Sequence, residues 1–281
     1  MRSSNPILRG SAFRNIPTAT TGEPMTINGT IARTGILIVL ALITGWWTWN
    51  RFMLAAAAAS GVSAGSIVAG GASLGTSAPA SMALSAGAAA GMAAISPFLW
   101  GGIIVGFILA LAGTFKPNWS PIAAPLYAIA EGTALGGISA MFNVQYHGIV
   151  LQAILASVGV LVVMLALYRT GVIKVTNKFR MGVMAATGGI LLLYLASWVL
   201  GMFTHVNMAF VTGGGGTFGV IFSLFVVCIA ALNLVLDFDL IDRASQANLP
   251  KYMEWYGALA LMVTLVWLYI QMLQLLASSR R

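Results

Sequence analysis

Stretches of about 20 apolar residues follow one another through this chain, separated by segments that hold nearly all of its charge. As α-helices rising 1.5 Å per residue, such stretches can cross a hydrocarbon core about 30 Å thick. Only 7% of the 281 residues are charged, against about 25% in an ordinary soluble domain. The sequence therefore predicts an all-α fold, a polytopic membrane helical bundle with about seven transmembrane helices and the lipid bilayer as its solvent. The stretches lie at residues 31–50, 96–115, 122–142, 148–168, 181–203, 217–236 and 255–276.

The basic residues predict how this bundle is oriented. If the seven stretches alternate in direction, every Lys and Arg falls on the side of the N-terminus except Arg51, Arg280 and Arg281. Cytosolic loops of membrane proteins carry an excess of Lys and Arg, so we expect a cytosolic N-terminus and an outer C-terminus. Because orientation accounts for the net charge of +8, we expect no nucleic-acid partner.

We divide the chain into a polar cytosolic arm at residues 1–30, a transmembrane domain at residues 31–276 and a tail at residues 277–281. The arm lacks the apolar segment of a cleavable signal peptide. Residues 52–95 are an uncharged insertion rich in Ala, Gly and Ser, and two structures are open for it. We favour an outer connector with extended ends on the first two helices over an additional hairpin of two weak spans.

Several motif matches do not predict an enzyme. Residues 61–65 and 71–75 fit the Gly-x-Ser-x-Gly pattern, but that motif needs a strand–turn–helix setting with His and acid partners. Residues 214–219 fit Gly-x-Gly-x-x-Gly without the preceding strand that a dinucleotide site requires. The two histidines, His147 and His205, are too few for a zinc site of about three protein ligands. We expect no catalytic residue and no bound cofactor.

Glu131 is the acid that lies deepest in a predicted span. It falls nine residues into the third stretch, about 14 Å from its start. A carboxylate at that depth must face the bundle interior, be protonated or find a partner. Gly132, Gly136, Gly137 and Ser139 follow it and form a face of small residues that favours close helix packing.

Asp237 and Glu254 lie at the ends of the last two spans. Asp237 ends the sixth stretch, with Asn233 one helical turn before it on the same face. Glu254 begins the seventh stretch on the same side of the membrane. The two acids can form a membrane-boundary pair, which would titrate together and could bind a cation through oxygen ligands. The alternative for Glu254 is that it lies there because an acid is favourable at a helix N-terminus.

The acids that follow Asp237 lie on a different helix face. Asp239 is rotated by about 200° from Asp237 and shares its face with Asp242 and Arg243, at spacings of three and four residues. We expect these three residues to form a solvated cytosolic cap.

A resemblance to a known family rests on residues 1–6, 127–132, 136–139, 236–241, 254–256 and 264–269. In these residues the sequence resembles the transmembrane Bax-inhibitor-motif family, in its bacterial YccA-like branch. The resemblance covers residues 1–50 and 96–276 and is most specific over the last 50 residues. It implies six helices wrapped around a central C-terminal helix, in a bacterial inner membrane. In the family this fold is linked with a pH-dependent Ca²⁺ leak, gated by two aspartates that share a proton.

The resemblance also implies roles for individual residues. Asp237 matches the first gate aspartate, whereas an ungapped match puts Thr264 at the second. A shift on the scale of a helical turn would bring Gln271 or Glu254 to that position instead.

The sequence therefore leaves two alternative functions open. The first is a cation leak or channel with Asp237 as its gate acid and Glu131 and Glu254 as pathway or partner acids. The second is a non-conducting interaction protein, for example a regulator of a membrane protease, since a bacterial relative binds such a protease. It would dock through the arm and the basic residues 169–180.

Overall fold

The computed structural model describes residues 23–60, 78–204 and 216–280, and within these ranges the chain is helical with no β-strand. The all-α prediction is confirmed. The serine motifs at residues 61–65 and 71–75, His205 and residues 1–22 of the arm lie outside the described ranges. The helices are α1 (Ile27–Ser60), α3 (Ala78–Phe115), α4 (Ser120–Gln145), α5 (Ile149–Arg169), α6 (Asn177–Thr204), α7 (Gly216–Gln246) and α8 (Met253–Ser279), with a 3₁₀ turn η1 (Pro117–Trp119).

Six of the helices in the described ranges are long and apolar enough to cross a membrane. The remaining helix, α4, has 26 residues, about 39 Å at helical rise, so its length also suffices. Its Gly and Ser residues and Glu131 lower its hydropathy, and the sequence predicts a packing role for four of the small residues, Gly132, Gly136, Gly137 and Ser139. The chain is a multi-pass membrane protein with a bundle of long apolar helices.

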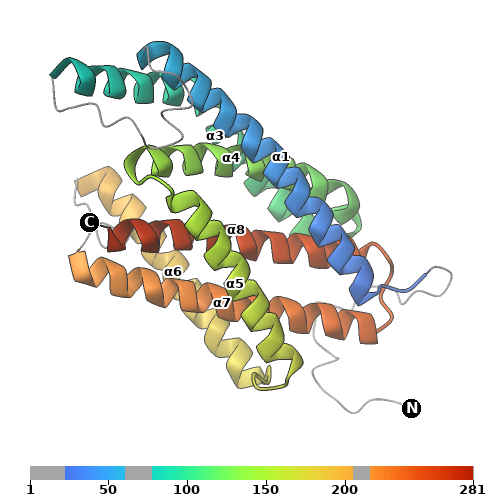
Figure 1. The fold of residues 1–281 in the computed structure, drawn as a ribbon. Helices are drawn as coiled ribbons and strands as arrows, with labels where there is room; N and C mark the ends of the chain where they lie inside the picture. The colour runs from blue at the N-terminus through green and yellow to red at the C-terminus, as the bar shows by residue number, and fades with distance from the viewer. Residues whose placement is uncertain (1–22, 61–77, 205–215, 281) are drawn as a thin grey trace, which may run out of the picture.

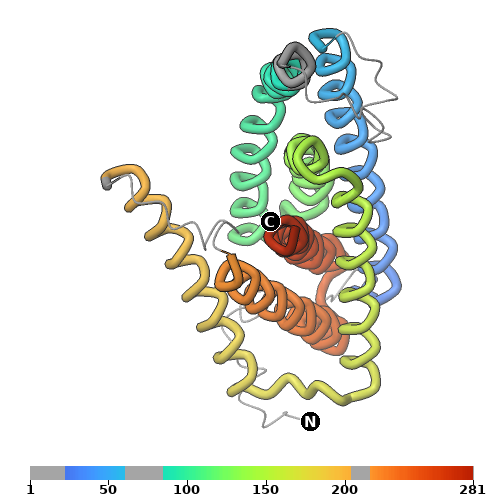
Figure 2. The backbone as a smooth tube through the Cα atoms, turned by 60° about the vertical axis from the view of Figure 1, so that its left-hand side comes forward, coloured from blue at the N-terminus to red at the C-terminus, as the bar shows by residue number. Residues whose placement is uncertain are grey.

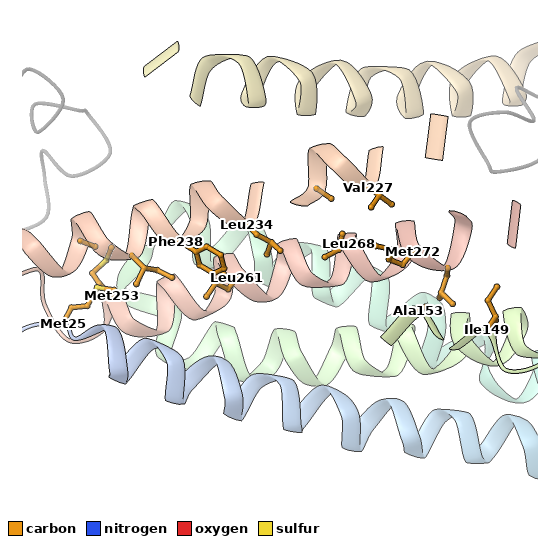
Figure 3. Close-up of a cluster of buried hydrophobic side chains, with 14 of the residues drawn as sticks. Met25, Ile149, Ala153, Val227, Leu234, Phe238, Met253, Leu261, Leu268 and Met272 are labelled. Carbon is orange, nitrogen blue, oxygen red and sulfur yellow. The ribbon is translucent and has the colours of Figure 1, made fainter. Parts of the chain in front are cut away.

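Helix α8 lies at the centre of the bundle, as Figures 1 and 2 show. It packs against α1, α3, α4, α5 and α7. Its Leu261 and Leu268 belong to one hydrophobic cluster with Leu234 and Phe238 of α7 (Figure 3). Its Leu259 belongs to a second cluster shared with α1 and α4. A central C-terminal helix is therefore explained by a sequence that is apolar on several faces at once.

Small residues bring α1, α3 and α4 close together. A Cβ atom on Gly136 would overlap the backbone of Gly45 in α1, and one on Gly45 would lie 3.1 Å from the Gly132 carbonyl oxygen. On another side of α4, a Cβ on Gly137 would lie 2.7 Å from the side chain of Leu99 in α3. The predicted small-residue face of α4 is confirmed, and two neighbouring helices use it.

The described part of the insertion at residues 52–95 continues the first two spans. Helix α1 runs on to Ser60, and Ile95 of α3 packs with Phe52 and Met53 of α1 in a hydrophobic cluster. The paired ends of α1 and α3 project beyond the other helices (Figure 1). Extended ends of the two helices are one part of the connector hypothesis, which stays a prediction because residues 61–77 are outside the described ranges.

Helix α6 diverges from the bundle toward its C-terminal end, as Figure 2 shows. Among the described helices it packs mainly against α7, with side-chain contacts to α8. The large side chains of Leu191, Trp198 and Phe203 are each more than 60% exposed. In a membrane protein such a surface is covered by lipid.

The two ends of the bundle differ in charge. The N-terminus of α1, the α5–α6 loop and the α7–α8 connection lie at one end, which we call the basic end. At the other end the Arg280 guanidinium donates to the His147 carbonyl oxygen, 3.0 Å away. The fold thus groups the basic residues as the alternation of spans predicts. Those of the basic end are Arg33, Lys116, Arg169, Lys174, Lys178, Arg180, Arg243 and Lys251.

Candidate functional site

Glu254, in the first turn of α8, is the most buried acid of the described chain, with 1% of its surface exposed. Its Oε2 atom forms an ion pair with the Arg33 guanidinium of α1. Its Oε1 atom accepts hydrogen bonds from the Thr26 backbone N–H, at 2.9 Å, and from the Thr26 hydroxyl, at 3.0 Å. A buried carboxylate is tolerated when it is paired and hydrogen-bonded, and here residues from the start of α1 meet both conditions.

The neighbours of this ion pair make room for it. A Cβ atom on Gly29 would collide with the Glu254 carboxyl group, so the absence of a side chain at this position lets α1 approach. The Arg33 guanidinium also lies over the Trp255 ring, 5.3 Å from its centroid. A cation held over an aromatic face gains further stabilisation where water is excluded.

Residues 23–26, which we call the N-terminal clip, fasten the chain before α1 to the α7–α8 connection. The Met25 backbone N–H donates to the Leu249 carbonyl oxygen at 2.8 Å. The Met25 side chain is buried beside Met253 (Figure 3). Lys251 forms an ion pair with Glu23, and this hydrogen-bonded cation lowers the pKa of Glu23 below its ordinary value.

Asp237 lies between α7 and α8 and has few compensating contacts. Its Oδ2 atom is buried and has no hydrogen-bond partner in the described part of the chain. The Thr264 side chain of α8 is within hydrogen-bonding reach of the carboxyl group. Tyr256, also on α8, is close enough to interact with it electrostatically. A buried carboxylate with an unpaired oxygen is costly in its charged form.

The expected pairing of Asp237 with Glu254 is not observed. Ile241 of α7 lies level with Gly257 of α8, 3.0 Å from a Cβ built there. Asp237 is four residues from Ile241 toward the membrane interior, and Glu254 is three residues from Gly257 in the opposite direction. At helical rise the two acids are about 10 Å apart along the helix axes. Sequence spacing could not reveal this, because it depends on the register between antiparallel helices.

Thr264 faces Asp237, at the place that the ungapped match to the family assigns to the second aspartate. The Thr264 hydroxyl is also 3.2 Å from the Ala260 carbonyl oxygen, to which it donates. Gln271, the alternative for that place, accepts a hydrogen bond from the Tyr194 hydroxyl of α6 at 3.2 Å. Thr264, rather than Gln271 or Glu254, is thus the residue of α8 beside the Asp237 carboxyl.

Asn233 is one turn from Asp237, but its side chain forms a hydrogen bond to α6. Its amide nitrogen donates to the Thr187 hydroxyl of α6 at 2.8 Å and to the Ile229 carbonyl oxygen at 2.9 Å. Together with the contact between Gln271 and Tyr194, this hydrogen bond links α6 to the two central helices.

Glu131 lies between α3 and α4, away from the interface that holds Asp237. Its Oε2 atom is 2.6 Å from a Cβ built on Gly106 of α3, and Tyr127 lies one turn before it, close enough for an electrostatic interaction. Within the described residues its carboxyl group has no hydrogen bond or ion pair. The acids predicted from sequence therefore lie in three separate surroundings rather than in one cluster.

Asp239 corrects one prediction. Instead of belonging to a solvated cap, it is 7% exposed and forms ion pairs with Arg243 at 2.9 Å and with Arg180 at 3.1 Å. The prediction was wrong because the spacing within α7 does not show that α6 begins beside this face. Asp242 is more accessible, and it accepts a hydrogen bond from Gln246 at 2.9 Å.

A metal centre is not evident in the ranges that the structure describes, where no group of three or more His, Cys, Asp or Glu side chains could hold an ion. A cation at Asp237 would therefore need water or backbone oxygens for most of its ligands.

A comparison with protein-family models matches residues 5–281 to the family described as Bax inhibitor 1 like. Neither a comparison with curated proteins nor one with solved structures found a match. The matched range includes all of the described residues, so α4, α7, α8 and the N-terminal clip fall within it.

Proposed function

Because this chain belongs to the Bax inhibitor 1 like family, we propose that it is a pH-sensitive cation leak protein with Ca²⁺ as the transported ion. The proposal places it in the YccA-like branch of that family and in a bacterial inner membrane, with the basic end facing the cytosol. It assigns the chain no enzymatic step and no resident cofactor.

The observation that carries the proposal is the buried Oδ2 atom of Asp237, which has no hydrogen-bond partner among the described residues. An ionised carboxylate in that position stabilises any arrangement of α7 and α8 in which water or a cation reaches it. A protonated one favours the packed arrangement. The equilibrium between a closed and an open state then depends on pH, and the leak increases as the pH rises.

The surroundings of Asp237 favour a response that depends on one proton. The groups facing it from α8 are Thr264 and Tyr256, and Asn233 lies one turn away on α7. The ion pair between Arg33 and Glu254 is about 10 Å away along the helix axes. Thr264, and not a second aspartate, faces Asp237. The proposed pH response therefore comes from the titration of one carboxyl group, whereas the family's gate has two aspartates that share a proton.

The other two acids have separate roles in the proposal. Glu131, which has no ion pair in the described structure, is a second acid on the cation pathway, between α3 and α4. Glu254 joins α8 to α1 through its ion pair with Arg33. This ion pair fixes the first turn of α8, the helix that packs against Asp237 of α7.

Calcium flux into liposomes tests the proposal. The full chain is reconstituted with an indicator inside the vesicles, and flux is measured over about pH 5 to 8 for the wild type, Asp237→Asn and the control Asp242→Asn. We expect the wild-type and control fluxes to rise with pH by at least about fivefold, within the usual range of coupling to a conformational equilibrium. Asp237→Asn removes this rise. A pH response that is identical in all three proteins contradicts the proposal.

The non-conducting alternative has its own support in the N-terminal clip, which fixes residue 23 at the basic end and so brings the arm to that end. An arm anchored there could bind a membrane protease. Deletion of residues 1–22 tests this, because it leaves the clip intact, whereas a longer deletion would remove contacts of Glu254. Loss of a co-purifying protease on this deletion, together with no flux at any pH, would favour the alternative.

A further inference from the structure

The loop between α5 and α6, with the helix ends beside it, carries three basic side chains whose charge is not compensated. Arg169, Lys174 and Lys178 are exposed, and none of them forms an ion pair in the described structure. Arg180 and Arg243, which lie nearby, differ from them because both are paired with Asp239. The segment from Arg169 to Lys178 thus carries three unpaired cations, while Arg180 of α6 and Arg243 of α7 are paired with Asp239.

The paired charges hold the loop in place. The Arg243 guanidinium donates to the Val175 carbonyl oxygen at 3.4 Å, and Arg180 fastens the start of α6 to Asp239 of α7. Gly171 adopts a positive φ of 73°, which ends α5 and turns the chain. The unpaired cations are therefore displayed on a folded loop rather than on a free tail.

The position of the loop relative to the bilayer follows from the length of α5. Its 21 residues span about 32 Å, which only just crosses the hydrocarbon core, so Arg169 lies at the membrane boundary. Val172 in the loop is 70% exposed, although it is apolar. Basic and apolar side chains that alternate at this depth suit the headgroup region of a membrane.

We propose that residues 169–178 bind the headgroups of anionic phospholipids. Phosphate groups lie at the depth of these side chains and carry the opposite charge. The sequence has no Asp or Glu between Glu131 and Asp237, so nothing within this segment competes for the cations. Asp242, at the end of α7, accepts hydrogen bonds from Gln246 and Tyr168. An acidic soluble protein fits less well, because Val172 is exposed among the cations and an apolar side chain gains nothing from an acidic, water-exposed partner.

Spin-labelled lipids test the proposal directly. The full chain is reconstituted in phosphatidylcholine vesicles, and the motionally restricted fraction is compared between spin-labelled phosphatidylglycerol and spin-labelled phosphatidylcholine. The variant is Lys174→Gln/Lys178→Gln, in which both substituted side chains are exposed. The matched control is Arg51→Gln/Arg280→Gln, which removes the same charge from the other end of the bundle.

We expect the wild type to prefer phosphatidylglycerol and the preference to weaken at high salt. The loop variant should lose about fivefold in relative association for each charge removed, while the control keeps the preference. Equal binding of the two lipids by the wild type would overturn the proposal. So would an unchanged preference in the loop variant, or an equal loss in the control. Binding of an acidic protein to the loop without any lipid preference would overturn it as well.

Discussion

At the scale of single residues, the buried acids Glu254 and Asp237 differ in how far neighbouring groups compensate their charge. Glu254 is buried with an ion pair and two hydrogen bonds, whereas Asp237 is left with an oxygen that has no partner. Removing one member of a buried ion pair costs about 3–5 kcal/mol, so the first acid is a fixed structural element. The second is poised to respond to a proton because its charged form is not compensated.

The fixed role of Glu254 predicts the effect of Gly29→Ala. The added methyl group would collide with the Glu254 carboxyl, which cannot turn away without losing its bonds to Arg33 and Thr26. We expect a loss of about 1–3 kcal/mol in the free energy of unfolding, measured by denaturation in detergent.

Gly35→Ala is the matched control for this prediction. It lies on the same helix, with no atom within 4 Å of a Cβ built there. Replacing glycine by alanine in a helix is favourable by up to about 1 kcal/mol, so this variant should be as stable as the wild type or more stable. Equal stability of the two variants would contradict the account of Gly29.

At the scale of helices, α6 is attached to the bundle through a few contacts between Arg180 and Tyr194, and its C-terminal part diverges. The ion pair of Arg180 with Asp239 fastens its first turns, and Asn233 holds Thr187 further along. The Tyr194 hydroxyl donates to Gln271 of α8, and beyond Tyr194 the large side chains of Trp198 and Phe203 face outward as the helix diverges (Figure 2). Because few contacts hold α6, the loss of one of them should increase local opening of this helix, which amide hydrogen exchange detects.

Asp239→Asn tests this attachment. The substitution removes the charge that pairs with Arg180 and Arg243, so we expect faster amide hydrogen exchange at residues 177–190, with little change in α8. Asp242→Asn is the control, because Asp242 has no ion pair in the described structure. Exchange at residues 177–190 that is the same in both variants would contradict the role of Asp239.

The helices themselves could be predicted from sequence, but contacts between distant residues could not. Apolar length predicted the spans, and the small residues after Glu131 predicted the close packing of α4. The burial of Asp239 and the pairing of Arg33 with Glu254 depend on which helix ends meet in space. A basic residue six positions into α1 was a usable signal, since a cation inside a span needs an acid.

At the scale of the whole molecule, the central helix connects the features described above. Helix α8 carries Glu254, which is tied to α1, and Thr264, which faces Asp237 on α7. The N-terminal clip adds a contact between the start of the chain and the α7–α8 connection. A change in the protonation of Asp237 would therefore alter its contacts with α8, while the first turn of α8 stays fixed to α1 by Glu254.

The most direct test of the proposed pH response of Asp237 moves the carboxyl group from α7 to α8, across the interface between these helices. Calcium flux into liposomes is measured against pH for Asp237→Asn and for the double variant Asp237→Asn/Thr264→Asp. Because Thr264 lies beside Asp237, the double variant returns one carboxyl group to the same place on the opposite helix. We expect the single variant to lose the pH dependence of the flux and the double variant to regain it. A single variant that keeps the wild-type pH response, or a folded double variant that stays insensitive to pH, would contradict the account.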